Sequence, residues 1–370
     1  MRDNRVVSSL MPDERGSLMA GCRCCVVLIW RDGPIYVVDG CVLGVMIFDV
    51  ARHKFSEGLL TLMLFALMAM GVALSAGDVA PVVGGAPLRS FIDGLEVKYP
   101  VASAAALLPL VVYAGLRFAR AAVRVGIYSA STLAPIALGG VAIFSSITTP
   151  NYLYMMVVVI LVAEVLGRLF YCFGANMRTS FLFTAMLALG AMPLVDSALI
   201  PLTLALPVIV IFVRGTLRET IITLAGVAFP TFVYCYIVWL LGGEFDAAFM
   251  DMWSVDSVAM QHSAVLSYLT VSRLIQLGVT LFLNICSIIV YNSVRVTLVD
   301  SARVIWRILI ALQVMLVAML MLMPSASPAV VTVLLLVMTT MLPQLFIRVD
   351  VYVATIAYLI WVASAVATIF

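Results

Sequence analysis

Residues 330–342 read Val-Val-Thr-Val-Leu-Leu-Leu-Val-Met-Thr-Thr-Met-Leu, an apolar stretch in which only the threonines carry a polar side chain. Similar stretches recur at 155–163 and 204–213. A chain that crosses hydrocarbon must pair its backbone amides internally, so it forms helices or a closed barrel. Barrel strands alternate apolar and polar residues over about ten positions. These stretches are almost continuously apolar instead, so the sequence predicts an all-α fold, a polytopic transmembrane helical bundle.

The composition of the whole chain favours the same class. Apolar residues make up 64% of the 370 residues and charged residues 11%, and the mean hydropathy is +1.18. Soluble domains contain about 45–50% apolar and about 25% charged residues, so a water-soluble fold could not hide this much apolar surface. The lipid bilayer is therefore an expected partner. The net charge of +2, without a basic cluster, argues against nucleic acid as another.

The first 45 residues differ in character from the rest of the chain. Their longest apolar run, 24–30, is too short to span a bilayer and lies too far along the chain for a signal peptide. From Met46 the sequence continues Ile-Phe-Asp-Val-Ala-Arg-His-Lys-Phe, an amphipathic lead typical of a bacterial inner-membrane protein. We interpret residues 1–45 as an N-terminal extension, either poorly ordered or an artefact of start-site assignment. Residues 46–370 are then the transmembrane helical domain.

The apolar stretches that are long enough to cross about 30 Å of hydrocarbon predict eleven spans. They lie near 59–76, 101–116, 129–148, 151–167, 179–195, 197–213, 220–241, 274–294, 304–323, 327–346 and 350–370. Pro193, Pro201 and Pro207 fall in the fifth and sixth spans, where neighbouring helices can pair the backbone groups that a kink frees.

The basic residues predict the orientation, because cytoplasmic segments collect Lys and Arg. With the first span starting inside, the residues on the cytoplasmic side are Arg52, Lys54, Arg117, Arg120, Arg124, Arg168, Arg178, Arg214, Arg218, Arg295, Arg303, Arg307 and Arg348. Only Arg89, Lys98 and Arg273 remain outside. The pattern predicts a multi-pass protein of the bacterial inner (cytoplasmic) membrane, with its N-terminus inside and its C-terminus outside.

Two of the predicted outside segments, 77–100 and 242–273, are longer than simple connections, which makes them the best places for chemistry or recognition. The first holds the candidate catalytic residues Asp78, Asp93 and Glu96. We expect it to fold back over the bundle through residues 91–95. A carboxylate that points inward should then have a raised pKa or a specific ligand, because burial disfavours the charged form.

Few polar side chains fall within the predicted spans. Glu164 and Arg168 are four residues apart and can meet on one helical face, either as a pair at the cytoplasmic end or as part of a relay. Asp196 is expected to cap a helix. The side chains of Asn284, Gln313 and Gln344 are expected to form hydrogen bonds between helices.

The sequence predicts no cofactor and no metal site. It contains no phosphate-binding glycine loop, no His-Glu-x-x-His helix and no Gly-x-Ser-x-Gly turn. His53 and His262 fall on opposite sides of the predicted membrane. The cluster Cys22-Arg23-Cys24-Cys25 lacks a second Cys or His pair at zinc-like spacing.

From Met46 onward the layout resembles a family of uncharacterised bacterial inner-membrane proteins of similar length and span count. The resemblance rests on the lead Met46–Phe55, on Gly115-Leu116-Arg117-Phe118, and on the block from Phe170 to Gly243. Within that block, Arg178-Thr179-Ser180-Phe181 and Arg214-Gly215-Thr216-Leu217-Arg218 each enter a helix. The family has no assigned activity, so this resemblance implies only the fold.

The same region resembles, more distantly, the C-type glycosyltransferases that use polyprenyl-phosphate sugars. Those enzymes carry an acidic residue in a large first outside loop, where it acts as general base or metal partner. Asp78 and Asp93 hold comparable positions, although the adjacent acidic pair common in that superfamily is absent.

Two functions therefore remain open at the level of sequence. The first is an enzyme of envelope biogenesis that acts on a lipid-linked substrate. The second is a non-catalytic membrane component, either a partner subunit or a permease for an envelope precursor. Outside carboxylates at a pocket would favour the enzyme. A polar cavity at mid-membrane depth, lined by Glu164, Asn284 or Gln313, would favour the second reading.

Overall fold

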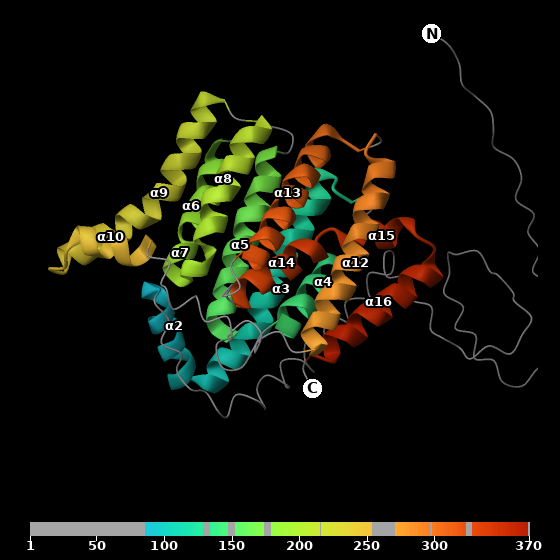
Figure 1. Ribbon diagram of the computed structural model, residues 1–370, viewed down its shortest axis with the longest axis horizontal. Coiled ribbons are helices and arrows are strands. Elements are labelled where there is room, and N and C mark those ends of the chain that lie inside the picture. Colours follow the sequence, from blue (N-terminus) through green and yellow to red (C-terminus); the bar gives the residue numbers. More distant parts are fainter. Residues whose placement is uncertain are drawn as a thin grey trace, which may run out of the picture. The chain divides into compact units, whose positions relative to one another are not determined.

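The computed structural model describes residues 86–128, 134–146, 152–173, 179–214, 216–253, 271–296, 298–322 and 328–368. Within these ranges the chain forms helices and no strand, which confirms the all-α prediction. Many of the helices lie side by side as a bundle (Figure 1). The predicted extension, 1–45, and the predicted first span, 59–76, lie outside the described residues.

The described helices follow one another along the chain as α2 (Pro87–Lys98), α3 (Pro100–Val125), α4 (Ala134–Ser146), α5 (Tyr152–Phe173), α6 (Thr179–Gly190), α7 (Met192–Val195), the 3-10 turn η2 (Ser197–Leu199), α8 (Ile200–Arg214), α9 (Leu217–Leu240), α10 (Phe245–Trp253), α12 (Val271–Val294), α13 (Asp300–Leu322), α14 (Pro328–Thr339), α15 (Leu342–Arg348) and α16 (Val351–Val366).

Among the described residues, six helical segments are long and apolar enough to cross a membrane. They are Pro100–Val123, Tyr152–Phe173, Leu217–Leu240, Val271–Val294, Asp300–Met321 and Pro328–Arg348. Shorter apolar segments lie at Thr179–Val195, Ser197–Val213 and Tyr352–Val366. These helices are those of a membrane protein. Each predicted span within the described residues contains helix, but several are too short or too broken to count as full spans, so the number eleven stays a prediction.

Prolines account for some of the interruptions. The predicted span 179–195 breaks at Ala191, and Pro193 lies in the first turn of α7. The predicted span 327–346 breaks between α14 and α15, and Pro343 lies in the first turn of α15. Proline is tolerated in a first helical turn because the amide hydrogen it lacks would have no partner in the helix there. Pro109, in contrast, lies inside the continuous helix α3.

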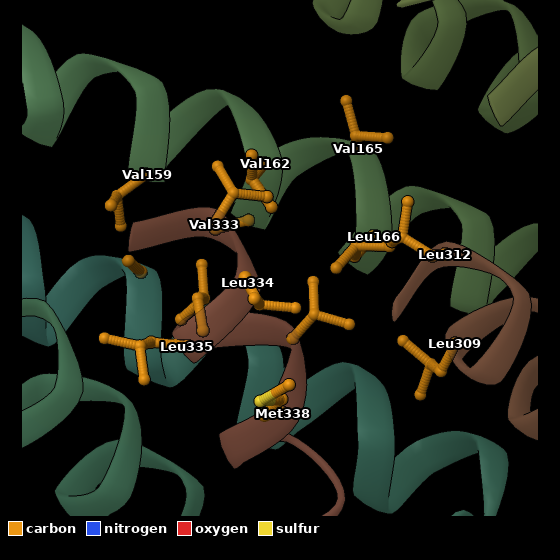
Figure 2. Packing of buried hydrophobic residues seen from close by; sticks show 14 of the residues in the cluster. Val159, Val162, Val165, Leu166, Leu309, Leu312, Val333, Leu334, Leu335 and Met338 are labelled. Carbon is orange, nitrogen blue, oxygen red and sulfur yellow. The ribbon is translucent and has the colours of Figure 1, made fainter. Parts of the chain in front are cut away.

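Helix α14 forms the centre of the bundle. It packs against α4, α5, α12 and α13, and every residue from Ala329 to Thr339 is buried. Its aliphatic side chains contact those of α5 and α13 (Figure 2). Helix α9 lies at the edge, with only 28% of its most apolar window buried against 94% for Pro328–Arg348. The apolar surface that α9 leaves exposed is of the kind that contacts lipid.

Candidate functional site

Helix α2 turns its acidic side chains toward the protein. Its buried residues are Ile92, Asp93 and Glu96, which share one helical face, whereas Phe91 is 64% exposed and Leu95 37% exposed. A surface helix in water has the reverse arrangement, with its charged face outward. An apolar outward face instead suits a helix that borders lipid or the headgroup layer.

The described part of the predicted outside segment 77–100, residues 86–100, thus folds against the bundle, as expected, but largely through this acidic face. Helix α2 packs against α3, α5 and α7. The expected contact through residues 91–95 is therefore correct for Ile92 and Asp93 and wrong for Phe91 and Leu95, which stay exposed. Asp78, the third candidate catalytic residue, lies outside the described residues.

Glu96 meets the first turn of α5. Its Oε2 atom accepts a hydrogen bond from the backbone amide of Leu153 at 3.0 Å. The first amides of a helix have no partner within the helix and carry the positive end of its dipole, so a carboxylate there is stabilised. The other carboxylate oxygen, Oε1, is buried and has no hydrogen-bond partner. Glu96 therefore caps α5 with one oxygen and leaves the second available.

Asp93 lies one helical turn before Glu96 and is held less firmly. Both of its carboxylate oxygens are buried without a hydrogen-bond partner. Its nearest cation is Arg89, whose Nε lies 3.8 Å from Oδ2. The guanidinium carbon of Arg89 also stands 4.3 Å from the ring centroid of Tyr154, a cation–π distance. Arg89 thus interacts with the Tyr154 ring and also forms a long ion pair with Asp93.

The burial of these two carboxyl groups changes their acidity. Burial raises the pKa of Glu96 to about 7, although the amides of Leu153 and Tyr152 oppose the shift. Burial also raises the pKa of Asp93, against the opposing charge of Arg89. A carboxyl group with a pKa near neutrality can accept or donate a proton at the pH of a cell, as a general acid or base must. We call Arg89, Asp93 and Glu96 the α2 acidic site.

The described helices of the two long predicted outside segments, α2 and α10, both contact α7. Helix α10 comes from the segment 242–273 and packs against α7, and α2 packs against α7 as well.

Asp196, which follows α7, accepts a hydrogen bond from the backbone amide of Ala198 at 3.0 Å and caps η2. The predicted capping role of Asp196 is therefore confirmed.

Glu164 forms an ion-pair network rather than an isolated pair. It accepts from Arg168 Nε at 2.7 Å, as the spacing of four residues predicted, and also from Nε and Nη2 of Arg117 at 2.8 and 2.9 Å. The hydroxyl of Tyr113 donates to it at 2.5 Å. Four hydrogen bonds satisfy this carboxylate and join α3 to α5, so its geometry favours a structural role over a proton relay.

The three amides predicted to bond between helices behave differently from one another. The Nε2 atom of Gln313 donates to the Met341 sulfur at 2.8 Å and lies 3.4 Å from the Val337 carbonyl oxygen, so the prediction is confirmed for this residue. It is wrong for Asn284 and Gln344, whose side-chain nitrogen and oxygen atoms are all buried without a hydrogen-bond partner.

Sequence reasoning missed several of these residues for identifiable reasons. The basic-residue pattern predicts Arg89 only as an outside charge, yet it lies four residues before Asp93, a spacing that places the two on one face. Arg117 and Tyr113 lie far from Glu164 along the chain, and only the packing of α3 on α5 brings them together. Gln276 and Thr280 precede Asn284 at intervals of four, a buried polar stripe that helical periodicity could have shown.

No group of three or more His, Cys, Asp or Glu side chains within the described residues is arranged to hold a metal ion. Comparison with known proteins adds no further assignment: no family model, no curated protein and no solved structure matches this chain.

Stability should depend on pH through Glu96. The ordinary pKa of a glutamate side chain is about 4.5, and the pKa of Glu96 in the native state is about 7. Between these two pH values the native carboxyl keeps a proton that the unfolded chain has lost. The native state therefore loses stability relative to the unfolded state as the pH rises through this window, by about 1–3 kcal/mol. Thermal unfolding of the purified protein between pH 4.5 and 8 measures the effect.

Glu96→Gln should remove this part of the pH dependence, whereas Glu244→Gln, at an exposed position, should keep it. Equal pH profiles for the wild type and Glu96→Gln would contradict the assignment.

Proposed function

We propose that this chain is an enzyme of the bacterial inner membrane that acts, at its outer face, on a lipid-linked substrate of envelope biogenesis. The proposal includes eleven spans with the N-terminus inside and the C-terminus outside. Two features support this arrangement. Basic residues alternate along the sequence as cytoplasmic segments require. Helices α2 and α10, from the two long predicted outside segments, also pack on the same short helix, α7.

The observation that carries the enzyme proposal is the arrangement of the α2 acidic site. Glu96 is 1% exposed and Asp93 5% exposed, and their three oxygens without a hydrogen-bond partner lie on one face of a helix packed on the bundle. Burying such groups without a hydrogen-bond partner is costly, and ionisable groups with perturbed pKa values cluster at functional sites. The exposed apolar face of α2 would let a substrate with a lipid tail approach from the bilayer.

The chemistry that fits this site is transfer of a group from a lipid phosphate to an acceptor hydroxyl. The acceptor oxygen forms a bond to the transferred carbon while the bond from that carbon to the phosphate oxygen breaks. The acceptor proton passes to the carboxylate of Asp93 or Glu96, and the lipid phosphate leaves with the bonding electrons. Arg89, the cation of the site, would hold that phosphate. The resemblance to C-type glycosyltransferases points to a sugar as the transferred group.

The alternative is a non-catalytic membrane component or a permease for an envelope precursor. The interrupted helix between α14 and α15 favours it, because broken helices at the centre of a bundle often bind solutes in transporters. The α2 acidic site is then a capping and packing arrangement only.

Substitution of the two carboxylates separates these functions. Asp93→Asn and Glu96→Gln keep the side-chain shape and remove proton transfer, so each should abolish or strongly reduce complementation of the envelope growth defect in a strain that lacks the native copy. Glu244→Gln, at an exposed position on the neighbouring segment, should complement normally. Membrane levels of each variant are measured in parallel to exclude loss of folding. Full complementation by both Asp93→Asn and Glu96→Gln would reject the catalytic role and favour the non-catalytic function.

The orientation has its own test. A reporter fused after Phe370 should be active when it is of the type that folds only outside the cytoplasm, because eleven spans from an inside N-terminus end outside. The same reporter fused after Arg218, in a predicted cytoplasmic segment, should be inactive. Activity of the Arg218 fusion together with silence of the Phe370 fusion would show that the orientation is inverted.

A further inference from the structure

Helix α12 is polar on its buried face and apolar on its exposed face. Its buried residues include Gln276, Thr280, Asn284, Ser287 and Tyr291, at intervals of three or four residues that place them on one face. Its exposed side chains include Phe282, Ile285 and Ile289. In a membrane this arrangement directs apolar groups to lipid and polar groups to the protein interior.

Most of this polar stripe has a partner on another element. The amide of Gln276 donates to the Ser145 hydroxyl, and the Thr280 hydroxyl accepts from the Trp361 indole at 3.0 Å. The Tyr291 ring stacks on that of Trp306, with the centroids 4.5 Å apart. Ser287 donates to the backbone carbonyl of Met341 at 2.7 Å. Asn284 differs, because neither atom of its amide has a hydrogen-bond partner although the residue is 1% exposed.

The Ser287 hydrogen bond reaches the interruption between α14 and α15. Side chains from three places hold the residues of this interruption, Thr340 and Met341. Besides Ser287 on α12, the hydroxyl of Tyr128 donates to the Thr340 carbonyl at 2.5 Å, and Gln313 on α13 donates to the Met341 sulfur at 2.8 Å. Such specific donors show that the interruption is a defined part of the fold rather than a frayed helix end.

A second amide without a partner lies beside this interruption. Gln344 is 0% exposed, and neither its side-chain nitrogen nor its oxygen has a hydrogen-bond partner. It lies three residues after Met341, and Asn284 lies three residues before Ser287, so each is about one helical turn from the Ser287–Met341 hydrogen bond. Helices α12 and α15 pack against each other, which brings the two amides into the same region of the bundle.

We propose that Asn284 and Gln344 form a binding site, at the interruption between α14 and α15, for an uncharged group rich in hydroxyls. Two primary amides offer both donors and acceptors, which match hydroxyl groups. The only charged residues of α12, α14 and α15 are Arg273, near the start of α12, and Arg348, at the exposed end of α15. The site therefore lacks a charged side chain on these helices that would select an ion. This site is independent of the α2 acidic site and of the function proposed there.

The first part of the test asks whether substitution of each amide raises or lowers the unfolding temperature of the protein. Asn284→Leu and Gln344→Met replace each amide by an apolar group of similar shape. Because the amides have no protein partner, both variants of the purified, ligand-free protein should unfold at the same temperature as the wild type or a higher one. Gln276→Met is the matched control, since it removes a buried amide of α12 that does have a partner, and it should lower the unfolding temperature. If Asn284→Leu and Gln344→Met lower the temperature as much as Gln276→Met, the amides have partners and the proposal is wrong.

The second part uses defined probes. Monoolein offers two hydroxyls on an acyl chain, methyl oleate offers the same chain without hydroxyls, and glycerol offers the hydroxyls from water. Monoolein or glycerol should raise the unfolding temperature of the wild type and of Gln276→Met by more than methyl oleate does. In Asn284→Leu and Gln344→Met this additional increase should be absent. A gain with monoolein alone assigns the ligand to the lipid phase, and a gain with glycerol alone assigns it to the aqueous phase. If neither probe gives a gain that the two substitutions remove, the proposal is overturned.

Discussion

The structure depends on one constraint: a polar group inside hydrocarbon must find its partner within the protein. Helix α12 meets this constraint by placing its polar stripe inward and its Phe282, Ile285 and Ile289 side chains outward. Glu164 meets it through four hydrogen bonds from Tyr113, Arg117 and Arg168. Helix α14 meets it by having few polar side chains, and this lets it occupy the centre of the bundle.

Two groups of side chains that depart from this constraint are the places where we expect function. At the α2 acidic site, Asp93 and one oxygen of Glu96 are buried without a hydrogen-bond partner. At the interruption between α14 and α15, Asn284 and Gln344 are in the same condition. The first site has ionisable groups suited to proton transfer, and the second has neutral amides suited to hydroxyls.

The sequence predicted the fold class and the positions of the long apolar helices because long apolar runs determine both, but it did not predict α2 and α10, which lie in the predicted outside segments. It could not predict where the runs at 179–195 and 327–346 break, since Pro109 and Pro230 lie inside continuous helices while Pro193 and Pro343 follow interruptions. Asp93 and Glu96 could be proposed from their outside position. Their burial could not, because it depends on α2 turning its acidic face toward α5 and α7. The contact of Arg117 with Glu164 likewise depends on tertiary packing alone.

The most direct test of the account is the lipid exposure of α12. The protein is reconstituted in vesicles with a small apolar diazirine dissolved in the bilayer, and the residues labelled on illumination are located by peptide mass spectrometry. Phe282, Ile285 and Ile289 should be labelled, while Asn284, Ser287 and the buried residues of α14 should not. Labelling of Asn284 and Ser287 at the level of Phe282 would show that the polar face of α12 is not turned inward, and would contradict the account.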